Sequence, residues 1–254
     1  MSDSKEKKDP LVSVVIPVYN AEKYIKDTVG TVLAQTMQDF EILLVNDHST
    51  DDSLQVMEGI ADERVRIIEG DGGSAARARN KGVQEARGRY IAYLDSDDAW
   101  LPEKLEKTLH FMEEKDCGFA FTAYEFADVE GKGLGKIVHV PEKLPYKKAL
   151  SRTIIFTSTV IFDLTKLGKE EIMMPDVKSE DTALWWKILK QGEIACGLDE
   201  NLVRYRTGGT SLSSNKSNAA KRIWALYGMQ GDLNFFQKAF YFCGWALRAV
   251  VRRM

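Results

Sequence analysis

The stretch Tyr90-Ile-Ala-Tyr-Leu-Asp95-Ser-Asp97-Asp98 joins an apolar strand to three carboxylates within four residues. Carboxylates this close together repel one another and are costly to bury without a counter-charge. A divalent cation is the simplest counter-charge, because Asp oxygens suit hard ions such as Mg²⁺ or Mn²⁺, which proteins hold with one or two carboxylates plus substrate phosphates. The alternative interpretation is a surface turn whose Asp residues cap the next helix.

The chain around this stretch alternates short apolar strands with amphipathic helices. Strands are expected at 11–19, 40–45, 65–68 and 90–95, with helices between them. Such alternation predicts a mostly parallel sheet with helices on its faces. Ligands of these sheets bind beyond the carboxyl ends of the strands. The side chains expected at that edge are Asn20, Asp47, Glu69 and the carboxylates from Asp95 to Asp98.

The second half of the chain has a different pattern. Strands are expected at 118–124, 136–140 and 157–162, helices after Pro102 and after Ser179, a polar loop at 203–215, and closing helices at 216–230 and 232–252. With 254 residues, 44% of them hydrophobic, the chain is long enough for a single large α/β domain with helices appended at its carboxyl end.

Several classes of protein are disfavoured by composition. The first ten residues are polar and charged, so we expect a disordered N-terminus rather than a signal peptide or membrane anchor. No apolar run reaches the roughly 18 residues that span a bilayer. Three widely spaced cysteines indicate neither a disulfide framework nor a metal site, which favours a cytoplasmic protein. No P-loop motif occurs, and we expect no nucleic-acid partner.

The tail differs from the rest of the chain in charge. Residues 211–254 carry seven Lys or Arg and one Asp, a net charge of +6, whereas the other residues carry −9. Aromatic residues lie beside these cations, which favours a helix at an anionic membrane surface. Packing on the catalytic domain and pairing in a homodimer are the alternatives. The favoured location is therefore peripheral, at the inner face of the cell membrane.

A glycine turn at Gly70 leads into a basic helix. The pattern Gly70-x-Gly72-x-x-Ala75 formally matches a dinucleotide fingerprint, but that fingerprint belongs on the first strand of a sheet and two strands precede it here. The helix N-terminus, with Arg77 or Arg79, can still present positive potential to a phosphate. A solvated basic face is the alternative for at least one of these arginines.

Five short motifs occur in a recognisable order. They are Val14-Val-Ile-Pro-Val-Tyr-Asn20, Phe40 to Asp47 with Ser49-Thr-Asp51, Ala75 to Gly82, Tyr90 to Asp98 with Trp100-Leu-Pro102, and Glu180-Asp181 with Leu184-Trp185. Together they make residues 13–186 resemble the family-2 glycosyltransferases of the GT-A fold, which are inverting enzymes that use nucleotide-activated sugars. The resemblance implies a Rossmann-like domain at 11–210, with a nucleotide-sugar half at 11–117 and an acceptor half at 118–210, followed by basic amphipathic helices at 211–254.

The resemblance also implies roles for individual residues. The nucleotide-sugar site would use Pro17, Tyr19, Asn20, Asp47, Arg77, Arg79, Asp95 and Ser96. Asp47 would face the uracil ring, Asp97 would lie nearest to the Mn²⁺ or Mg²⁺, and Asp95 would contribute to both the ribose and the metal. Asp181 would be the catalytic base that takes the proton of the acceptor hydroxyl. Glu180 is the second candidate for that base.

The expected reaction transfers one hexosyl or N-acetylhexosaminyl unit from a nucleotide sugar, with UDP favoured, to an acceptor hydroxyl. A lipid-linked glycan in bacterial surface polysaccharide synthesis is the expected acceptor. The sequence departs from the family at Asn46 and His48, where Asp and Gly are common, and it lacks the Gln-x-x-Arg-Trp element of processive synthases. The alternatives are a sugar-phosphate nucleotidyltransferase, which would release pyrophosphate, and a nucleotide-sugar-binding module without catalysis.

Overall fold

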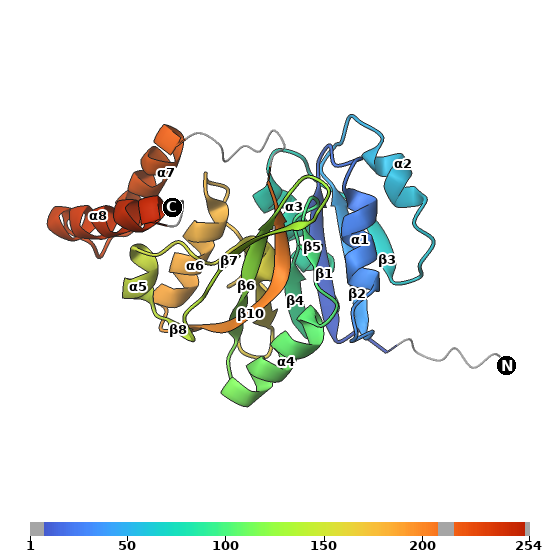
Figure 1. Cartoon of the computed structure of the whole chain (residues 1–254), viewed down its shortest axis with the longest axis horizontal. Helices are drawn as coiled ribbons and strands as arrows, with labels where there is room; N and C mark the ends of the chain where they lie inside the picture. Colours follow the sequence, from blue (N-terminus) through green and yellow to red (C-terminus); the bar gives the residue numbers. More distant parts are fainter. Residues whose placement is uncertain (1–7, 208–215, 252–254) are drawn as a thin grey trace.

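The structure is a computed structural model that describes residues 8–207 and 216–251. It is an α/β domain built on one sheet (Figure 1). Its strands are β1 (Val12–Val18), β2 (Phe40–Asn46), β3 (Val65–Glu69), β4 (Tyr90–Tyr93), β5 (Ala99–Trp100), β6 (Phe119–Ala127), β7 (Gly133–Val138), β8 (Lys143–Leu144), β9 (Ile161–Asp163) and β10 (Ala195–Arg206). The helices are α1 (Ile25–Leu33), α2 (Ser53–Glu58), α3 (Ala75–Glu85), α4 (Lys104–Lys115), α5 (Tyr146–Leu150), α6 (Glu180–Lys190), α7 (Lys216–Met229) and α8 (Phe235–Val251).

The sheet has the strand order β3-β2-β1-β4-β9-β6-β10-β5, with β7 paired to β6 and β8 paired to β10. β1 pairs in parallel with β2 and β4, and β2 pairs in parallel with β3. β9 runs antiparallel to both β4 and β6, so β6 points the same way as β4, and β10 is parallel to β6. The carboxyl ends of β1, β2, β3, β4, β6 and β10 therefore meet at one edge of the sheet.

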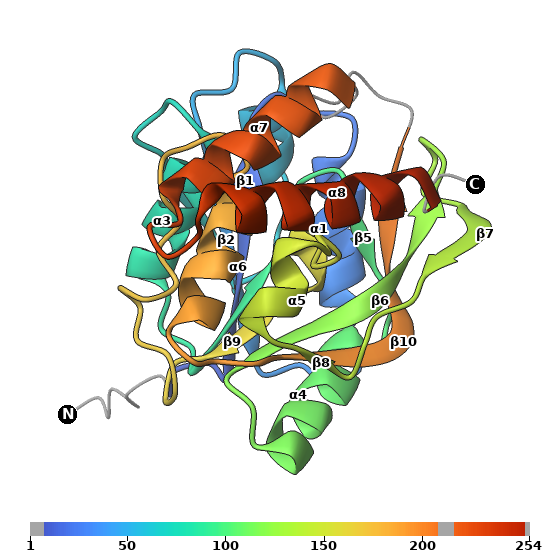
Figure 2. The same cartoon turned by 90° about the vertical axis from the view of Figure 1, so that its left-hand side faces the viewer.

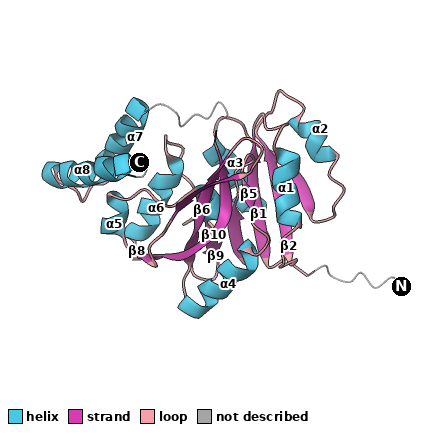
Figure 3. Ribbon diagram, in the orientation of Figure 1, coloured by secondary structure: helices cyan, strands magenta, loops and turns pink. Residues whose placement is uncertain are grey.

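Helices cover both faces of the parallel half. α1 and α3 lie on opposite sides of the β1–β2 pair (Figures 2 and 3). α3 approaches the sheet closely at Gly82, where an added Cβ would lie 2.3 Å from Val15 Cγ1 and 3.2 Å from Val45 Cγ2. The absence of a side chain at Gly82 lets the backbone of α3 lie directly against β1 and β2, where there is no room for a methyl group.

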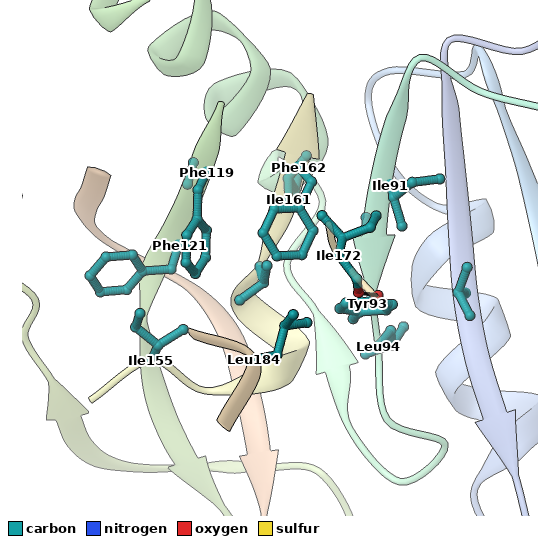
Figure 4. Packing of buried hydrophobic residues seen from close by; sticks show 14 of the residues in the cluster. Ile91, Tyr93, Leu94, Phe119, Phe121, Ile155, Ile161, Phe162, Ile172 and Leu184 are labelled. Carbon is teal, nitrogen blue, oxygen red and sulfur yellow. Dashed lines mark hydrogen bonds between the residues drawn. The ribbon is translucent and has the colours of Figure 1, made fainter. Parts of the chain in front are cut away.

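Aromatic side chains fill the core where the two halves of the sheet join (Figure 4). The rings of Phe162 on β9, Phe119 on β6 and Trp185 on α6 form a mutual cluster, with centroid distances of 4.8 Å (Phe162–Phe119), 5.8 Å (Phe162–Trp185) and 5.3 Å (Phe119–Trp185). Tyr93 contacts Phe162 edge to face at 6.0 Å, and its hydroxyl donates to the Ile172 carbonyl. Burial of several large rings contributes a few kcal/mol each and holds β4, β6, β9 and α6 together.

The expected strands and helices agree with the structure except in a few places. Thr157–Thr159 forms a 3₁₀ turn, so only the end of the expected 157–162 strand is extended, in β9. The prediction of a polar loop from 203 was wrong up to Arg206, because those residues belong to β10. α4 begins at Lys104 rather than at Pro102, and α8 begins at Phe235 rather than at 232. Residues 1–7, the expected loop from 208 to 215, Arg252 and Arg253 lie outside the described residues.

The two closing helices pack on the domain. Tyr227 of α7 is fully buried, its ring stacks on Trp186 at 5.0 Å, and its hydroxyl donates to the Leu150 carbonyl. Trp245 of α8 donates to Thr153 Oγ1 over 3.0 Å. The other side of α8 is exposed, with 81% of Phe236 accessible to solvent. Among the described helices, none is both long enough and apolar enough to cross a membrane.

Candidate active site

The carboxyl-end edge of the sheet contains a cavity of about 710 Å³. Its wall is made by Pro17, Val18, Tyr19, Asp47, His48, Gly72, Gly73, Ser74, Ala75, Ala78, Arg79, Asp95, Ser96 and Asp97. Seven of the residues predicted for the site, Pro17, Tyr19, Asp47, Arg79, Asp95, Ser96 and Asp97, thus lie around one cavity. They come from the ends of β1, β2 and β4 and from the first turns of α3, as expected for parallel strands.

The turn that carries the carboxylates is held by a buried hydroxyl. Ser158 Oγ accepts the backbone N–H of Asp95 over 3.1 Å and donates to Asp98 Oδ2 over 2.5 Å. Asp98 is fully buried, and its Oδ1 accepts the backbone N–H of Arg206. Asp98 therefore ties the turn to the 3₁₀ turn and to β10, and it does not line the cavity. The three adjacent carboxylates divide into one structural side chain and two that face the cavity.

The carboxyl group of Asp97, which lines the cavity, has a strongly raised pKa. Burial, and next the negative charge of Asp95, raise its pKa from 3.8 to about 6. A divalent cation would relieve both effects. Within the described residues no group of three or more His, Cys, Asp or Glu is arranged to hold a metal ion. Asp95 and Asp97 nevertheless fit a hard cation, because two carboxylates with substrate phosphates complete such a site.

The cavity wall also presents a buried acceptor, on Asp47 at the end of β2. Asp47 Oδ1 is buried without a hydrogen-bond partner among the described atoms, whereas the Asp47 backbone N–H donates to the Val18 carbonyl over 2.8 Å. His48 follows in the left-handed conformation, with φ of 60°, and its ring lies against Gly72. A buried carboxylate oxygen without a donor is costly, so this atom is suited to receive an N–H group from a ligand.

Arg79 joins the cavity to the first turn of α6. It is buried, its Nη2 lies 2.5 Å from Asp95 Oδ1, and its Nη1 lies 3.2 Å from Glu180 Oε1. Asp181, the next residue, is half-buried and accepts the backbone N–H of Thr182 over 2.6 Å. Burial, followed by the negative charge of Glu180, raises the pKa of Asp181. Asp181 does not itself line the cavity, but it follows Glu180, which Arg79 joins to Asp95. A carboxylate with a raised pKa can accept a proton from an approaching hydroxyl.

Arg77 and Asn20 point elsewhere. Arg77 is exposed and pairs with Asp176 at 2.8 Å, so the two arginines of the basic helix have different environments. Asn20 is exposed with φ of 50°, and its side chain accepts the backbone N–H of Thr50 over 2.8 Å. Neither residue is among those that line the cavity. Their predicted roles in nucleotide binding stay predictions.

The sequence analysis did not single out Arg206. Its side chain is 8% exposed, Nε and Nη1 have no hydrogen-bond partner among the described atoms, and Nη2 lies 3.9 Å from Asp27 Oδ2. The guanidinium lies 5.3 Å from the centre of the Tyr24 ring, and its positive charge lowers the pKa of Asp97. Arg206 was assigned to a loop because residues 203–215 are polar and rich in hydroxyl groups and glycine. An Arg of this kind is suited to an anionic ligand.

The fold is shared with solved glycosyltransferases. A Staphylococcus aureus TarS fragment in complex with UDP-GlcNAc superimposes with a TM-score of 0.69 and 21% identity, over 94% of this chain and 72% of that one. A mannosyltransferase from Pyrobaculum calidifontis, in complex with GDP-Man and Mn²⁺, gives a TM-score of 0.69 and 18% identity, over 95% of this chain and 70% of that one. At these identities the likeness establishes the GT-A fold.

Sequence comparison establishes the family. The model of glycosyl transferase family 2 matches residues 13–172. The chain is 44% identical to a Bacillus subtilis protein named as a teichuronic acid biosynthesis glycosyltransferase, TuaG, over 96% of this chain and 98% of that one. It is 36% identical to the Escherichia coli UDP-Glc:alpha-D-GlcNAc-diphosphoundecaprenol beta-1,3-glucosyltransferase WfgD, over 87% of this chain and 86% of that one. The chain belongs to glycosyl transferase family 2.

Proposed function

We propose that the protein transfers one sugar from a UDP-sugar to a hydroxyl group of a lipid-diphosphate-linked glycan, with inversion at the anomeric carbon. Membership of family 2 supports sugar transfer rather than nucleotidyl transfer or binding without catalysis. The activity named for the Escherichia coli relative supports UDP as the donor nucleotide and a diphosphoundecaprenol-linked acceptor. The role named for the Bacillus subtilis relative supports a place in the synthesis of a bacterial surface polysaccharide.

One observation in the cavity supports a nucleobase that donates an N–H group. Asp47 Oδ1 is a buried acceptor without a partner among the described atoms, and it lies in the same cavity as Asp95 and Asp97. The N3–H of uracil can donate to this carboxylate. Thymine has the same N–H group, so the choice of UDP rests on the activity named for the Escherichia coli relative. The base end of the cavity and the carboxylate end are then the two ends of one nucleoside-diphosphate site.

The transfer step uses the carboxylate of Asp181. The acceptor hydroxyl attacks the anomeric carbon while Asp181 removes its proton, the bond between this carbon and the diphosphate oxygen breaks, and UDP leaves from the opposite face. This single displacement inverts the anomeric centre and needs only one carboxylate base. Arg79 holds Glu180 and Asp95, which positions the first turn of α6 relative to the donor site.

Asp97 and Asp95 would hold the divalent cation, Mn²⁺ or Mg²⁺. When bound, this cation would offset the negative charge that develops on the departing diphosphate. The positive charge of Arg206 on β10 also lowers the pKa of Asp97. These charges support the proposal that a diphosphate and its cation bind at this part of the cavity.

A donor panel tests the proposed function. The protein is incubated with UDP-, GDP- and dTDP-sugars, Mn²⁺ and a GlcNAc-diphospholipid acceptor, and the released nucleoside diphosphate is measured. We expect release from UDP-sugars only and none in excess chelator. Asp47→Asn should raise the KM for the UDP-sugar about tenfold or more, since it replaces a charged acceptor by a neutral amide whose NH2 group cannot accept the N–H of the base. Asp71→Asn is the matched control, because Asp71 is exposed and does not line the cavity. Preference for another nucleotide, or full turnover without metal, would contradict the proposal.

We also propose that the closing helices contact a membrane surface from the cytoplasmic side. Phe236 and Phe240 are 81% and 74% exposed on α8, and basic residues flank them. Full-length protein should sediment with anionic vesicles, and Phe236→Ser combined with Phe240→Ser should remain in the supernatant. Removal of both helices is an unsuitable test, since Tyr227 of α7 is part of the core. If neither protein sediments, a dimer of this face is the alternative, which size-exclusion chromatography would detect.

A further inference from the structure

A second cavity, of about 910 Å³, lies between β7 and α8. Its lining residues come from the second half of the chain and are distinct from those of the nucleotide site. Figure 2 shows the carboxyl-terminal part of α8 beside β7. The cavity is lined by Lys136, Ile137, Val138, His139, Ser151, Arg152, Ile154, Phe240, Cys243, Gly244, Leu247 and Arg248. We name this cavity the α8 groove. Its volume lies in the range of sites that hold small molecules.

The α8 groove is apolar and open to solvent. Phe240, Cys243 and Leu247 follow one another at helical spacing on α8, and Phe240 and Leu247 are 74% and 68% exposed. Ile137 of β7 faces the same space and is 40% exposed. The opposite side of α8 already packs on the domain through Tyr241, Phe242 and Trp245. The exposed side is therefore not needed to attach the helix.

The charge around the α8 groove has one sign. Lys136, Arg152 and Arg248 line it, and the described lining residues include no Asp or Glu. Arg248 donates to the Ser151 hydroxyl and to the carbonyls of Ser151 and Gly244, which are neutral partners that leave its charge in place. His139 is paired with Asp199 outside this set, at 3.1 Å. An apolar space rimmed by cations is complementary to an apolar chain that ends in an anion.

A series of contacts leads from the α8 groove to the active site. Lys136 Nζ lies 5.8 Å from the centre of the Phe126 ring, and Phe126 contacts Tyr205 at a centroid distance of 5.6 Å. Arg206 follows Tyr205, and its backbone N–H donates to Asp98 in the carboxylate turn. The α8 groove and the carboxylate turn are thus joined by a short series of side chains on β6, β7 and β10.

We propose that the α8 groove binds the first part of the prenyl chain of a prenyl-diphosphate-linked acceptor, with Lys136 and Arg248 facing the diphosphate. This inference rests on the proposed function, and it adds the site at which the protein binds the lipid part of the acceptor. The glycan then extends from the diphosphate over the aromatic rings of Phe126 and Tyr205 toward the carboxylates. Exposed Phe236 lies outside the α8 groove and is left to contact the membrane.

Cys243 offers a direct measure of occupancy, because it is exposed and lines the α8 groove, whereas Cys117 and Cys196 are buried. Full-length protein is treated with a maleimide, and the rate of alkylation of Cys243 is followed by mass spectrometry. Farnesyl diphosphate should slow the reaction at least fivefold, and UDP, inorganic diphosphate and farnesol should have much smaller effects. No protection by farnesyl diphosphate overturns the proposal. Equal protection by diphosphate alone overturns it as well, since that result indicates an anion site only.

Two exposed apolar residues of α8 provide matched variants. Leu247→Ser, inside the α8 groove, should raise the concentration of farnesyl diphosphate needed for half-protection about tenfold, as expected for a lost buried leucine contact. Phe236→Ser, outside it, should leave that concentration unchanged. If anionic vesicles protect Cys243 but farnesyl diphosphate does not, or if both variants act equally, the face is a membrane contact and the proposal is wrong.

Donor turnover is measured on the same preparations. UDP-sugar turnover with no protection of Cys243 overturns the lipid site and leaves the proposed function standing. Protection without UDP release from any UDP-sugar overturns the proposed function and leaves the lipid site standing. Phe236→Ser should transfer the donor sugar at the wild-type rate to a water-soluble sugar phosphate, because Phe236 lines neither the α8 groove nor the donor cavity.

Discussion

Arg79 Nη2 lies 2.5 Å from Asp95 Oδ1, which joins helix α3 to the carboxylate turn through a buried ion pair. Because the same guanidinium also contacts Glu180, one buried cation compensates two carboxylates. Arg79→Met would leave both unpaired and should lower the free energy of unfolding by about 3–5 kcal/mol. Arg77→Met, two residues away, removes an exposed pair with Asp176 and should cost about 1 kcal/mol or less. Denaturant unfolding of the two variants gives the comparison, and equal losses would contradict this account.

Asp97→Asn should abolish metal-dependent turnover and stabilise the metal-free protein. The pKa of Asp97 is about 6 in the folded chain against 3.8 ordinarily, so the folded state must ionise an unfavourable group as pH rises through that interval. At pH 7 the substitution should therefore raise the free energy of unfolding by about 1–3 kcal/mol. Thermal unfolding in chelator measures this gain, with Asp71→Asn as the exposed control. A destabilised variant would indicate that Asp97 has a structural role like that of Asp98.

The pH dependence of kcat should have an acidic limb set by Asp181. Burial and the adjacent Glu180 raise the pKa of this carboxyl, and a base works only when it is deprotonated. The rate should fall as pH is lowered through that raised pKa, at a pH above the ordinary value of 3.8. Asp181→Asn should lower kcat by about 10²-fold or more and remove the acidic limb, while calorimetry shows unchanged donor affinity. Lost donor affinity with normal kcat would reassign Asp181 to binding.

Lys104 gives a prediction about stability that is independent of catalysis. This side chain is fully buried, and its Nζ lies 4.2 Å from the Trp100 ring centre without a hydrogen-bond partner among the described atoms. Burial lowers its pKa well below 10.5, so the unfolded chain binds more protons and stability rises with pH up to the unfolded pKa. Lys104→Met should raise Tm at pH 7 by several degrees and flatten that pH dependence. Lys107→Met, on the exposed side of α4, is the control.

Parallel strands made much of the site predictable from sequence. The apolar strands 11–19, 40–45 and 90–95 end in polar side chains, and parallel pairing brings Asp47 and Asp95 to one edge without any knowledge of distant contacts. The contact between Arg79 and Glu180 was not predictable, because it joins residues about a hundred positions apart through a side-chain geometry that no local pattern encodes. The two arginines of α3 look alike in sequence. Their environments differ only in the folded chain, where Arg77 is exposed and pairs with Asp176 while Arg79 is buried and pairs with Asp95.

The strand β10 was missed for a local reason. Its register against β6 shifts between Leu198 and Asn201 and again before Val203, so the alternation of apolar and polar residues is broken by polar ones at an irregularity. Arg206, the last residue of β10, was therefore predicted to lie in a loop. Asp98 was grouped with its neighbours for a similar reason, since sequence alone does not tell which of three adjacent carboxylates turns inward to Ser158.

Gly82 does not line the cavity, yet the site depends on it, because α3 approaches β1 closely at this residue. A methyl group there would be driven into Val15 and would lift the helix away from the strand. Arg79 lies less than one helical turn earlier, so its guanidinium would travel with the helix and leave Asp95 behind. An alanine at this position would mimic the loss of a site residue in any assay of turnover. Substitutions that the site can accept are therefore limited by the helix–sheet spacing at Gly82 as well as by the chemistry of the residues that line the cavity.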